Sequence, residues 1–298
     1  MSSRDCGDMA CGAFIGSGCA FIGCDKAYEG AEYVLFGAPY DSTASFRPGS
    51  RFASKCMRAD SFGMETYSPY QDKDLEDAFV CDAGDLNLGA GNTELALEKI
   101  EGFVNRVING GKKPAMIGGE HLVSLGAVRA LRARYPELRV VQFDAHADLR
   151  DDYQGARLSH ATVMRRCWDV LGDGRIYQFG IRSGDKSEFI WSEGRTRLAK
   201  FGFSSLEDAV SQLKSKPVYF TLDLDVLDPS VLPGTGTPEA GGANYESLAA
   251  AAAQLSQLNI VGFDMVELAP AYDPGGMSTA VACKLFREIL LMFCKKGK

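Results

Sequence analysis

Three short apolar segments, at 115–117, 139–143 and 218–222, are each followed by side chains that bind metal ions in proteins. Residues two apart in an extended chain project to the same side. The polar groups of Asp-Ala-His-Ala-Asp therefore share a face, as do the two carboxylates of Asp-Leu-Asp. The segment 115–117 is followed by Gly-Gly-Glu-His, in which the two glycines permit a tight turn before the histidine. The six candidate ligands are His121, Asp144, His146, Asp148, Asp223 and Asp225.

Such a set of carboxylates is costly to bury at strand ends unless a cation neutralises it. The three polar stretches contain no Lys or Arg before Arg150. Six ligands are too many for one ion with an open position, and two divalent ions would balance the charge of four carboxylates. Carboxylate-rich ligation with some imidazole favours Mn²⁺ over Zn²⁺. Two ions about 3.5–4 Å apart can activate a shared water, so the predicted reaction is hydrolysis at carbon or phosphorus.

The elements that must position these ligands follow from the hydrophobic pattern. Apolar, β-branched runs predict strands, and apolar spacings of three and four residues predict helices between them. This alternation predicts right-handed βαβ units in one α/β domain with a mostly parallel sheet, whose carboxyl ends would gather the ligands. The expected strands are 33–36, 115–117, 139–143, 175–179, 218–222 and 260–263, and the expected helices are 92–109, 123–134, 245–257 and 278–293.

Composition limits the class of protein. The 298 residues are 46% apolar, which excludes general disorder, and their net charge of −7 argues against a nucleic-acid partner. No apolar run is long enough to cross a membrane. The stretch 9–24 is interrupted by glycines and follows acidic residues, so residues 1–30 are interpreted as an N-terminal loop extension of a single domain over 1–298. Nine cysteines without a Cys-x-x-Cys pair are expected to be free thiols in the cytoplasm.

The ligand segments resemble the ureohydrolase family, which includes arginase and agmatinase. The resemblance rests mainly on Gly-Gly-Glu-His at 118–121, Phe-Asp-Ala-His-Ala-Asp at 143–148, and the long motif at 223–239. Shorter matches at 37–41, 47–52 and 82–85 extend it over most of the chain. The segments 47–51 and 149–155 are most similar to bacterial agmatinases.

This resemblance implies a three-layer α/β/α fold, a binuclear centre with two Mn²⁺ per chain, and a cytoplasmic homotrimer or homohexamer. His121, Asp144, Asp148 and Asp225 would serve one ion, and Asp144, His146, Asp223 and Asp225 the other. A metal-bridging hydroxide would attack the guanidinium carbon of a small cationic guanidino substrate. The expected reaction is hydrolysis of agmatine to putrescine and urea.

The resemblance also assigns roles outside the metal site. Glu267 matches the carboxylate that binds the guanidinium group, and His160 matches the histidine that relays protons to the leaving amine. Asp151 and Asp152 would suit an ammonium tail, whereas Arg150 beside them would suit a carboxylate tail. The substrate therefore stays open among those of agmatinase, arginase, guanidinobutyrase and aminopropylagmatine ureohydrolase. A non-catalytic metal-binding protein on the same fold is the alternative from another class.

Overall fold

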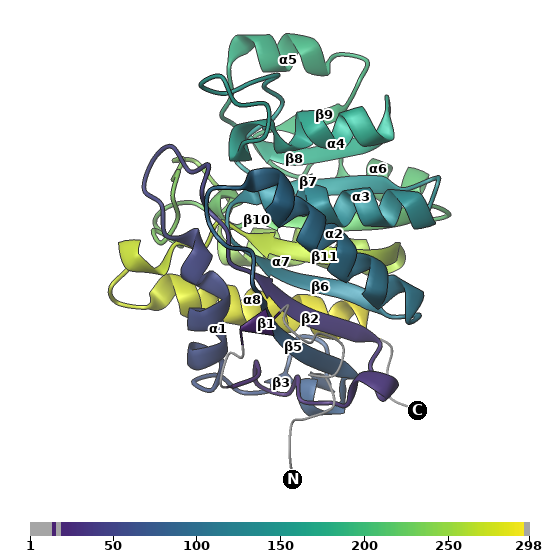
Figure 1. Ribbon diagram of the computed structural model, residues 1–298, viewed down its shortest axis with the longest axis vertical. Coiled ribbons are helices and arrows are strands. Elements are labelled where there is room, and N and C mark those ends of the chain that lie inside the picture. Colours follow the sequence, from purple (N-terminus) through teal and green to yellow (C-terminus); the bar gives the residue numbers. More distant parts are fainter. Residues whose placement is uncertain (1–13, 16–18, 295–298) are drawn as a thin grey trace.

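A nine-stranded sheet forms the centre of the computed structural model, which describes residues 14–15 and 19–294 (Figure 1). The strand order is β1-β5-β2-β6-β11-β10-β7-β8-β9; β1 is antiparallel to β5, and the other eight strands are parallel. The strands are β1 Phe14–Ile15, β2 Tyr33–Ala38, β5 Val80–Leu86, β6 Lys113–Gly118, β7 Arg139–Phe143, β8 Ile176–Ile181, β9 Arg197–Lys200, β10 Pro217–Asp223 and β11 Asn259–Val266; β3 Tyr67–Ser68 and β4 Lys73–Asp74 form a separate pair.

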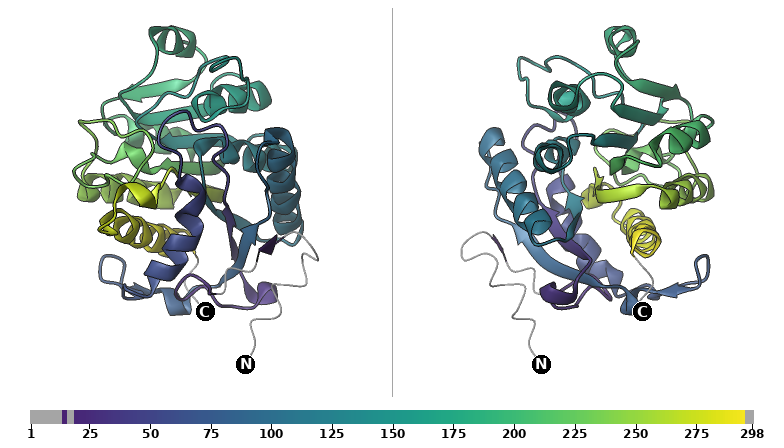
Figure 2. Two further views of the ribbon diagram at one scale, coloured as in Figure 1. Left: turned by 60° about the vertical axis from the view of Figure 1, so that its left-hand side comes forward. Right: turned by 90° about the vertical axis from the view of Figure 1, so that its right-hand side faces the viewer.

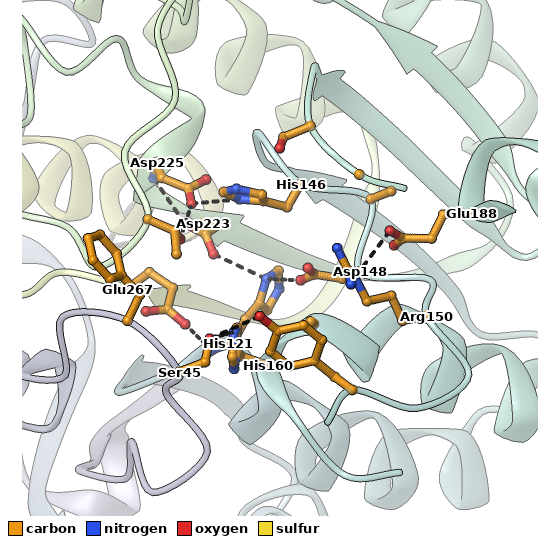
Figure 3. A pocket seen from close by; sticks show the side chains of 17 residues that line it. Ser45, His121, His146, Asp148, Arg150, His160, Glu188, Asp223, Asp225 and Glu267 are labelled. Atoms are coloured by element: carbon orange, nitrogen blue, oxygen red, sulfur yellow. Dashed lines mark hydrogen bonds and ion pairs between the residues drawn. The ribbon is translucent and has the colours of Figure 1, made fainter. Parts of the chain in front are cut away.

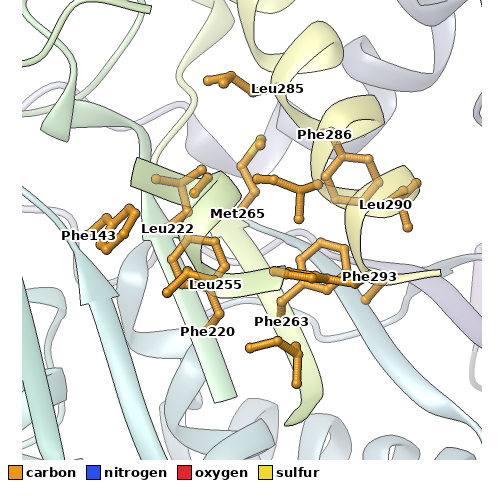
Figure 4. Close-up of a cluster of buried hydrophobic side chains, with 14 of the residues drawn as sticks. Phe143, Phe220, Leu222, Leu255, Phe263, Met265, Leu285, Phe286, Leu290 and Phe293 are labelled. Atoms are coloured by element: carbon orange, nitrogen blue, oxygen red, sulfur yellow. The ribbon is translucent and has the colours of Figure 1, made fainter. Parts of the chain in front are cut away.

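Helices cover both faces of this sheet, which makes three layers (Figure 2). The helices are α1 Ala53–Ser61, α2 Thr93–Asn109, α3 Ser124–Arg134, α4 Val163–Leu171, α5 Lys186–Ser192, α6 Leu206–Leu213, α7 Tyr245–Gln254 and α8 Met277–Phe293. One core cluster packs α2, α3 and α4 on one face, and the other packs α1, α6, α7 and α8 on the opposite face. In the second cluster, aromatic rings of β10, β11 and α8 lie against one another (Figure 4).

The predicted fold class and each of the predicted strands and helices are confirmed. Gly110 caps α2 as expected, and its N–H bonds to the carbonyl of Arg106. The sequence pattern missed β5, whose Val-Cys-Asp-Ala-Gly-Asp-Leu sequence is not an apolar run, and the edge strand β9. It also missed α1, α4, α5 and α6, which have 9, 9, 7 and 8 residues.

One of the described cysteines departs from the expectation of free thiols. Cys24, Cys56, Cys167, Cys283 and Cys294 carry free thiols, but Cys81 on β5 is disulfide-bonded. Residues 1–13 and 16–18 lie outside the described residues, so the interpretation of residues 1–30 as a loop extension stays a prediction, as does the single domain over 1–298; the described part contains β1 and the 3₁₀ turn Tyr28–Gly30. None of the described helices has the length and apolar character needed to span a bilayer.

Candidate metal centre

The carboxyl ends of the adjacent strands β6, β11, β10 and β7 place the candidate ligands at one edge of the sheet. His121 begins a 3₁₀ turn, His121–Val123, shortly after β6. Asp144 follows β7 directly, and Asp223 is the last residue of β10. Asp225 lies in the next 3₁₀ turn, η7 Leu224–Val226. Parallel strands thus bring together side chains that are about a hundred residues apart in the sequence.

The six side chains form two adjoining groups, and Figure 3 shows all of them except Asp144. The Nδ1 atom of His121 lies 3.0 Å from an oxygen of Asp144 and 3.2 Å from one oxygen each of Asp148 and Asp223. The Nδ1 atom of His146 lies 2.9 Å from Asp225 and 3.6 Å from the other oxygen of Asp144. Asp144 therefore reaches both histidines and joins the two groups.

These residues fit a divalent metal centre. The buried Nδ1 of His121 has no hydrogen-bond partner although three carboxylates face it. Its Nε2 lies 2.9 Å from Oγ1 of Thr221, a hydroxyl that in turn donates to Asp264, so Nδ1 is left to face the carboxylates. Burial, followed by the charge of Asp144, raises the pKa of Asp148 to about 7. A cation among the ligands would offset the cost of burying the negative charge of Asp148 and so lower the pKa of this carboxyl group.

The division of ligands implied by the resemblance differs from the arrangement of the side chains. The resemblance implied Asp225 for both ions and Asp223 only for the ion beside His146, yet the carboxylate that faces His121 is that of Asp223. Asp225 faces His146 and accepts a hydrogen bond from the backbone of Ala145. The reason is local: the strand ends at Asp223, and the 3₁₀ turn that follows rotates Asp225 toward the end of β7.

Glu267 lies immediately after β11 and points at the turn that carries His121. Its Oε1 accepts the backbone N–H of His121 at 2.7 Å, and its own N–H donates to the carbonyl of Gly119 at 2.9 Å. Its φ of 64° is in the left-handed region, a strained conformation for a glutamate. A Cβ on Gly119 would stand 2.0 Å from the carbonyl oxygen of Tyr40, so close packing requires this glycine.

His160 also lines the cavity beside these residues. It begins the 3₁₀ turn His160–Thr162, and its Nε2 lies 3.5 Å from Oγ of Ser45. Its ring packs edge-to-face on Tyr153 with centroids 5.6 Å apart. Burial lowers the pKa of His160 to about 4, so the imidazole is neutral at pH 7. A cavity of about 230 Å³ is lined by His160, Glu267 and most of the candidate ligands.

The two aspartates expected at the substrate tail are not brought to this cavity. A carboxylate oxygen of Asp151 accepts a hydrogen bond from Arg166 at 2.7 Å, and this side chain is 68% exposed. Asp152 accepts the backbone N–H of Gly155 in a turn. Neither of them lines the cavity. They were expected at the cavity because they are close to Asp148 in the sequence, but the chain leaves the cavity after Arg150.

Glu188, which was not among the residues predicted for the site, is a buried carboxylate that lines the cavity. It accepts the backbone N–H groups of Leu149 and Asp185 at 2.8 and 2.7 Å. Arg150 lies between the two carboxylates, 2.9 Å from Asp185 and 3.4 Å from Glu188. The signal was present, because Asp-x-x-Glu at 185–188 is the sequence of a helix capping box.

Comparison with known proteins identifies the family. The model of the arginase family matches residues 31–292. The agmatinase of Bacillus subtilis (strain 168) is 44% identical over 283 residues, which cover 94% of this chain and 98% of the relative. The chain therefore belongs to the arginase family, and the resemblance to ureohydrolases is confirmed.

Two further relatives are similar over most of the chain. The crystal structure of the agmatine ureohydrolase of Thermoplasma volcanium superposes with a TM-score of 0.84 at 34% identity, and the match covers 92% of this chain and 93% of that one. The N(1)-aminopropylagmatine ureohydrolase of Thermococcus kodakarensis is 36% identical, and the match covers 81% of this chain and 84% of the relative.

Proposed function

We propose that this protein is an agmatinase-type ureohydrolase that hydrolyses agmatine to putrescine and urea, with two Mn²⁺ bound per chain. The observation that carries the proposal is the pair of adjoining His–Asp groups beside a buried carboxylate, Glu267. Identity of 44% to an agmatinase over nearly the whole chain supports agmatine as the substrate.

His121, Asp144, Asp148 and Asp223 would hold one ion, and Asp144, His146 and Asp225 the other. Such ions lower the pKa of a shared water toward neutrality and so supply a nucleophile at pH 7. The donor set of carboxylate oxygens and two imidazoles is compatible with Mn²⁺.

Two side chains of the cavity would act on the substrate. Glu267 would bind the planar guanidinium group of the substrate through charge-assisted hydrogen bonds. These bonds would hold the guanidinium carbon beside the candidate metal ligands. His160, neutral at pH 7, would take a proton as water adds to that carbon and return it to the leaving amine. Since Arg150 and Glu188 both line the cavity, charges of both signs are available to a substrate tail.

A substrate panel tests the proposal. Urea release from the Mn²⁺-loaded protein is measured with agmatine, arginine, 4-guanidinobutyrate and N1-aminopropylagmatine, together with metal analysis. We expect agmatine to have the highest kcat/KM. Fastest turnover of another guanidino compound would overturn the substrate, and no urea from any of them would favour a non-catalytic metal-binding protein.

We further propose that the enzyme works in the cytoplasm as a homotrimer or homohexamer. The proposal rests on the resemblance to ureohydrolases, and exposed apolar side chains such as Phe52 and Phe62, 53% and 60% exposed, are available to a contact between copies of the chain. Light scattering coupled to size-exclusion chromatography measures the mass directly, and a monomer at micromolar concentration would contradict the assembly.

A further inference from the structure

Arg182, which directly follows β8, uses its guanidinium to bind main-chain carbonyl groups. It donates at 2.7 Å to the carbonyl of Asp225 and at 2.8 Å to that of Glu239. Further donor–acceptor distances of 3.2–3.4 Å join it to the carbonyls of Gly180, Val226, Leu227 and Ala240. One side chain thus fixes the backbone of a metal ligand, Asp225, and that of a distant loop.

The loop at 239–243 is held against the η7 segment by further bonds. The backbone N–H groups of Asp228 and Ala243 donate at 2.9 Å to the carbonyls of Ala243 and Val226, respectively. The carboxylate of Asp228 accepts the N–H groups of Gly241 and Gly242 at 2.8 and 3.1 Å. A Cβ on Gly242 would stand 2.7 Å from Arg182, so the guanidinium packs closely on this loop.

The same loop presents a carboxylate to His146. Ser183 donates its hydroxyl to Oε1 of Glu239 at 2.8 Å, and this oxygen lies 4.0 Å from Nε2 of His146. The other ring nitrogen of His146 faces Asp225. A histidine that binds a metal through Nδ1 carries its proton on Nε2, and at 4.0 Å the Glu239 oxygen can accept from this N–H through one water and so orient the ring.

We propose that Arg182 and Glu239 are positioning residues for the half of the metal centre formed by His146 and Asp225. Arg182 sets the backbone of Asp225 and of Glu239, and Glu239 sets the ring of His146. We call this pair the Arg182–Glu239 clamp. The inference rests on the proposed function, because it requires that ions bind at the centre.

Metal binding by the apo protein tests the clamp without reference to turnover. Calorimetric titration with Mn²⁺ is carried out on the wild type, R182K, E239A and E239Q. In R182K and E239A we expect one of the two ions to bind 10–100-fold more weakly. E239Q keeps an acceptor oxygen and should bind both ions within about threefold of the wild type. The double variant R182K/E239A should be less than additive, because both changes act on one segment.

Anomalous scattering from crystals grown with limiting Mn²⁺ shows which ion is weakened. We expect reduced occupancy beside His146 and unchanged occupancy beside His121. R175K is the matched control, because Arg175 stands at the opposite end of the same strand and also donates to a carbonyl, that of Pro136 at 2.6 Å. It should bind both ions as the wild type does.

The outcomes separate this inference from the proposed function. A wild type that binds no divalent ion would overturn the proposed function. If the wild type binds two ions and both R182K and E239A bind them equally well, the clamp alone is overturned. Equal weakening of both ions in R182K, or the same weakening in R175K, would assign Arg182 a general structural role and also overturn the clamp. Should R182K not fold, the comparison of E239A with E239Q still decides the matter.

Discussion

Asp144 is the side chain on which both halves of the metal centre depend, because its two oxygens face His121 and His146, respectively. We expect Asp144→Ala to bind neither ion tightly and Asp148→Ala to lose only the ion beside His121. Plasma mass spectrometry of protein dialysed against trace Mn²⁺ gives the stoichiometry. Two ions per chain in Asp144→Ala would contradict the shared role of this carboxylate.

Glu267 lies beside the metal ligands without being one of them, so its loss should separate substrate binding from metal binding. Replacing its carboxylate in Glu267→Gln removes a charge-assisted bond to a guanidinium, a loss of about 1.5–3 kcal/mol. We expect kcat/KM to fall about 10- to 100-fold while both ions are retained. Steady-state kinetics and metal analysis on the same preparation check this, and an unchanged kcat/KM would remove Glu267 from the mechanism.

His160 should make stability depend on pH. Burial lowers its pKa to about 4, whereas a histidine in the unfolded chain titrates near 6.5. Between these values the unfolded chain binds the extra proton, so the stability contributed by the neutral ring is present above pH 6.5 and lost as pH falls toward 4. The difference in Tm between wild type and His160→Asn should therefore shrink from pH 7.5 to pH 5. A constant difference would show that the ring titrates normally.

The gathering of the six candidate ligands could be predicted from residue types and spacing, because a strand places alternate side chains on one face. Which carboxylate faces which histidine could not be predicted, since the 3₁₀ turn that follows Asp223 and contains Asp225 breaks the alternation of a strand. The positions of Asp151 and Asp152 outside the cavity could not be predicted either, because no local sequence pattern indicates the turn that follows Arg150. The contact of Glu239 with the loop after β8 joins residues 56 apart in the chain and could be seen only in the fold.

At the scale of elements, the hydrophobic pattern of the sequence identified the strands that consist of a continuous apolar run. It missed β5, which carries charged side chains. On β5, Asp82 and Asp85 are both paired with Arg58 of α1, which is fully buried. These carboxylates interrupt the apolar run that marks the other inner strands. Their partner lies in another element, so no local pattern indicates that the charges of Asp82 and Asp85 are neutralised by Arg58.

This ion-pair cluster predicts a large effect on stability. Arg58→Met would leave Asp82 and Asp85 without their cation in the interior, which costs about 3–5 kcal/mol. Urea denaturation measures the free energy of unfolding. Arg157→Met is the control, because the Arg157 side chain is 70% exposed and its pair with Asp169 should be worth no more than about 1 kcal/mol. Similar losses in the two variants would contradict the assigned importance of burial.

At the scale of the whole molecule, the metal centre links strands from both halves of the chain. Its candidate ligands follow β6, β7 and β10, so the ions would tie together the carboxyl ends of three strands, and Glu267 follows β11, which lies between β6 and β10. The same ions would neutralise four carboxylates of an acidic protein with a net charge of −7. Metal binding should therefore stabilise the fold as well as supply the chemistry.

Removal of the ions should lower Tm. Free Mn²⁺ at a hundredfold excess over its Kd stabilises the folded state by about 2.7 kcal/mol per site. At about 2 °C per kcal/mol for a chain of this size, chelation should lower Tm by about 5 °C or more. Differential scanning fluorimetry with a chelator, followed by addition of Mn²⁺, should show the loss and its reversal. In Asp144→Ala, where the shared ligand is missing, the chelator should change Tm little. An equal shift there would mean that the chelator acts elsewhere than at this centre.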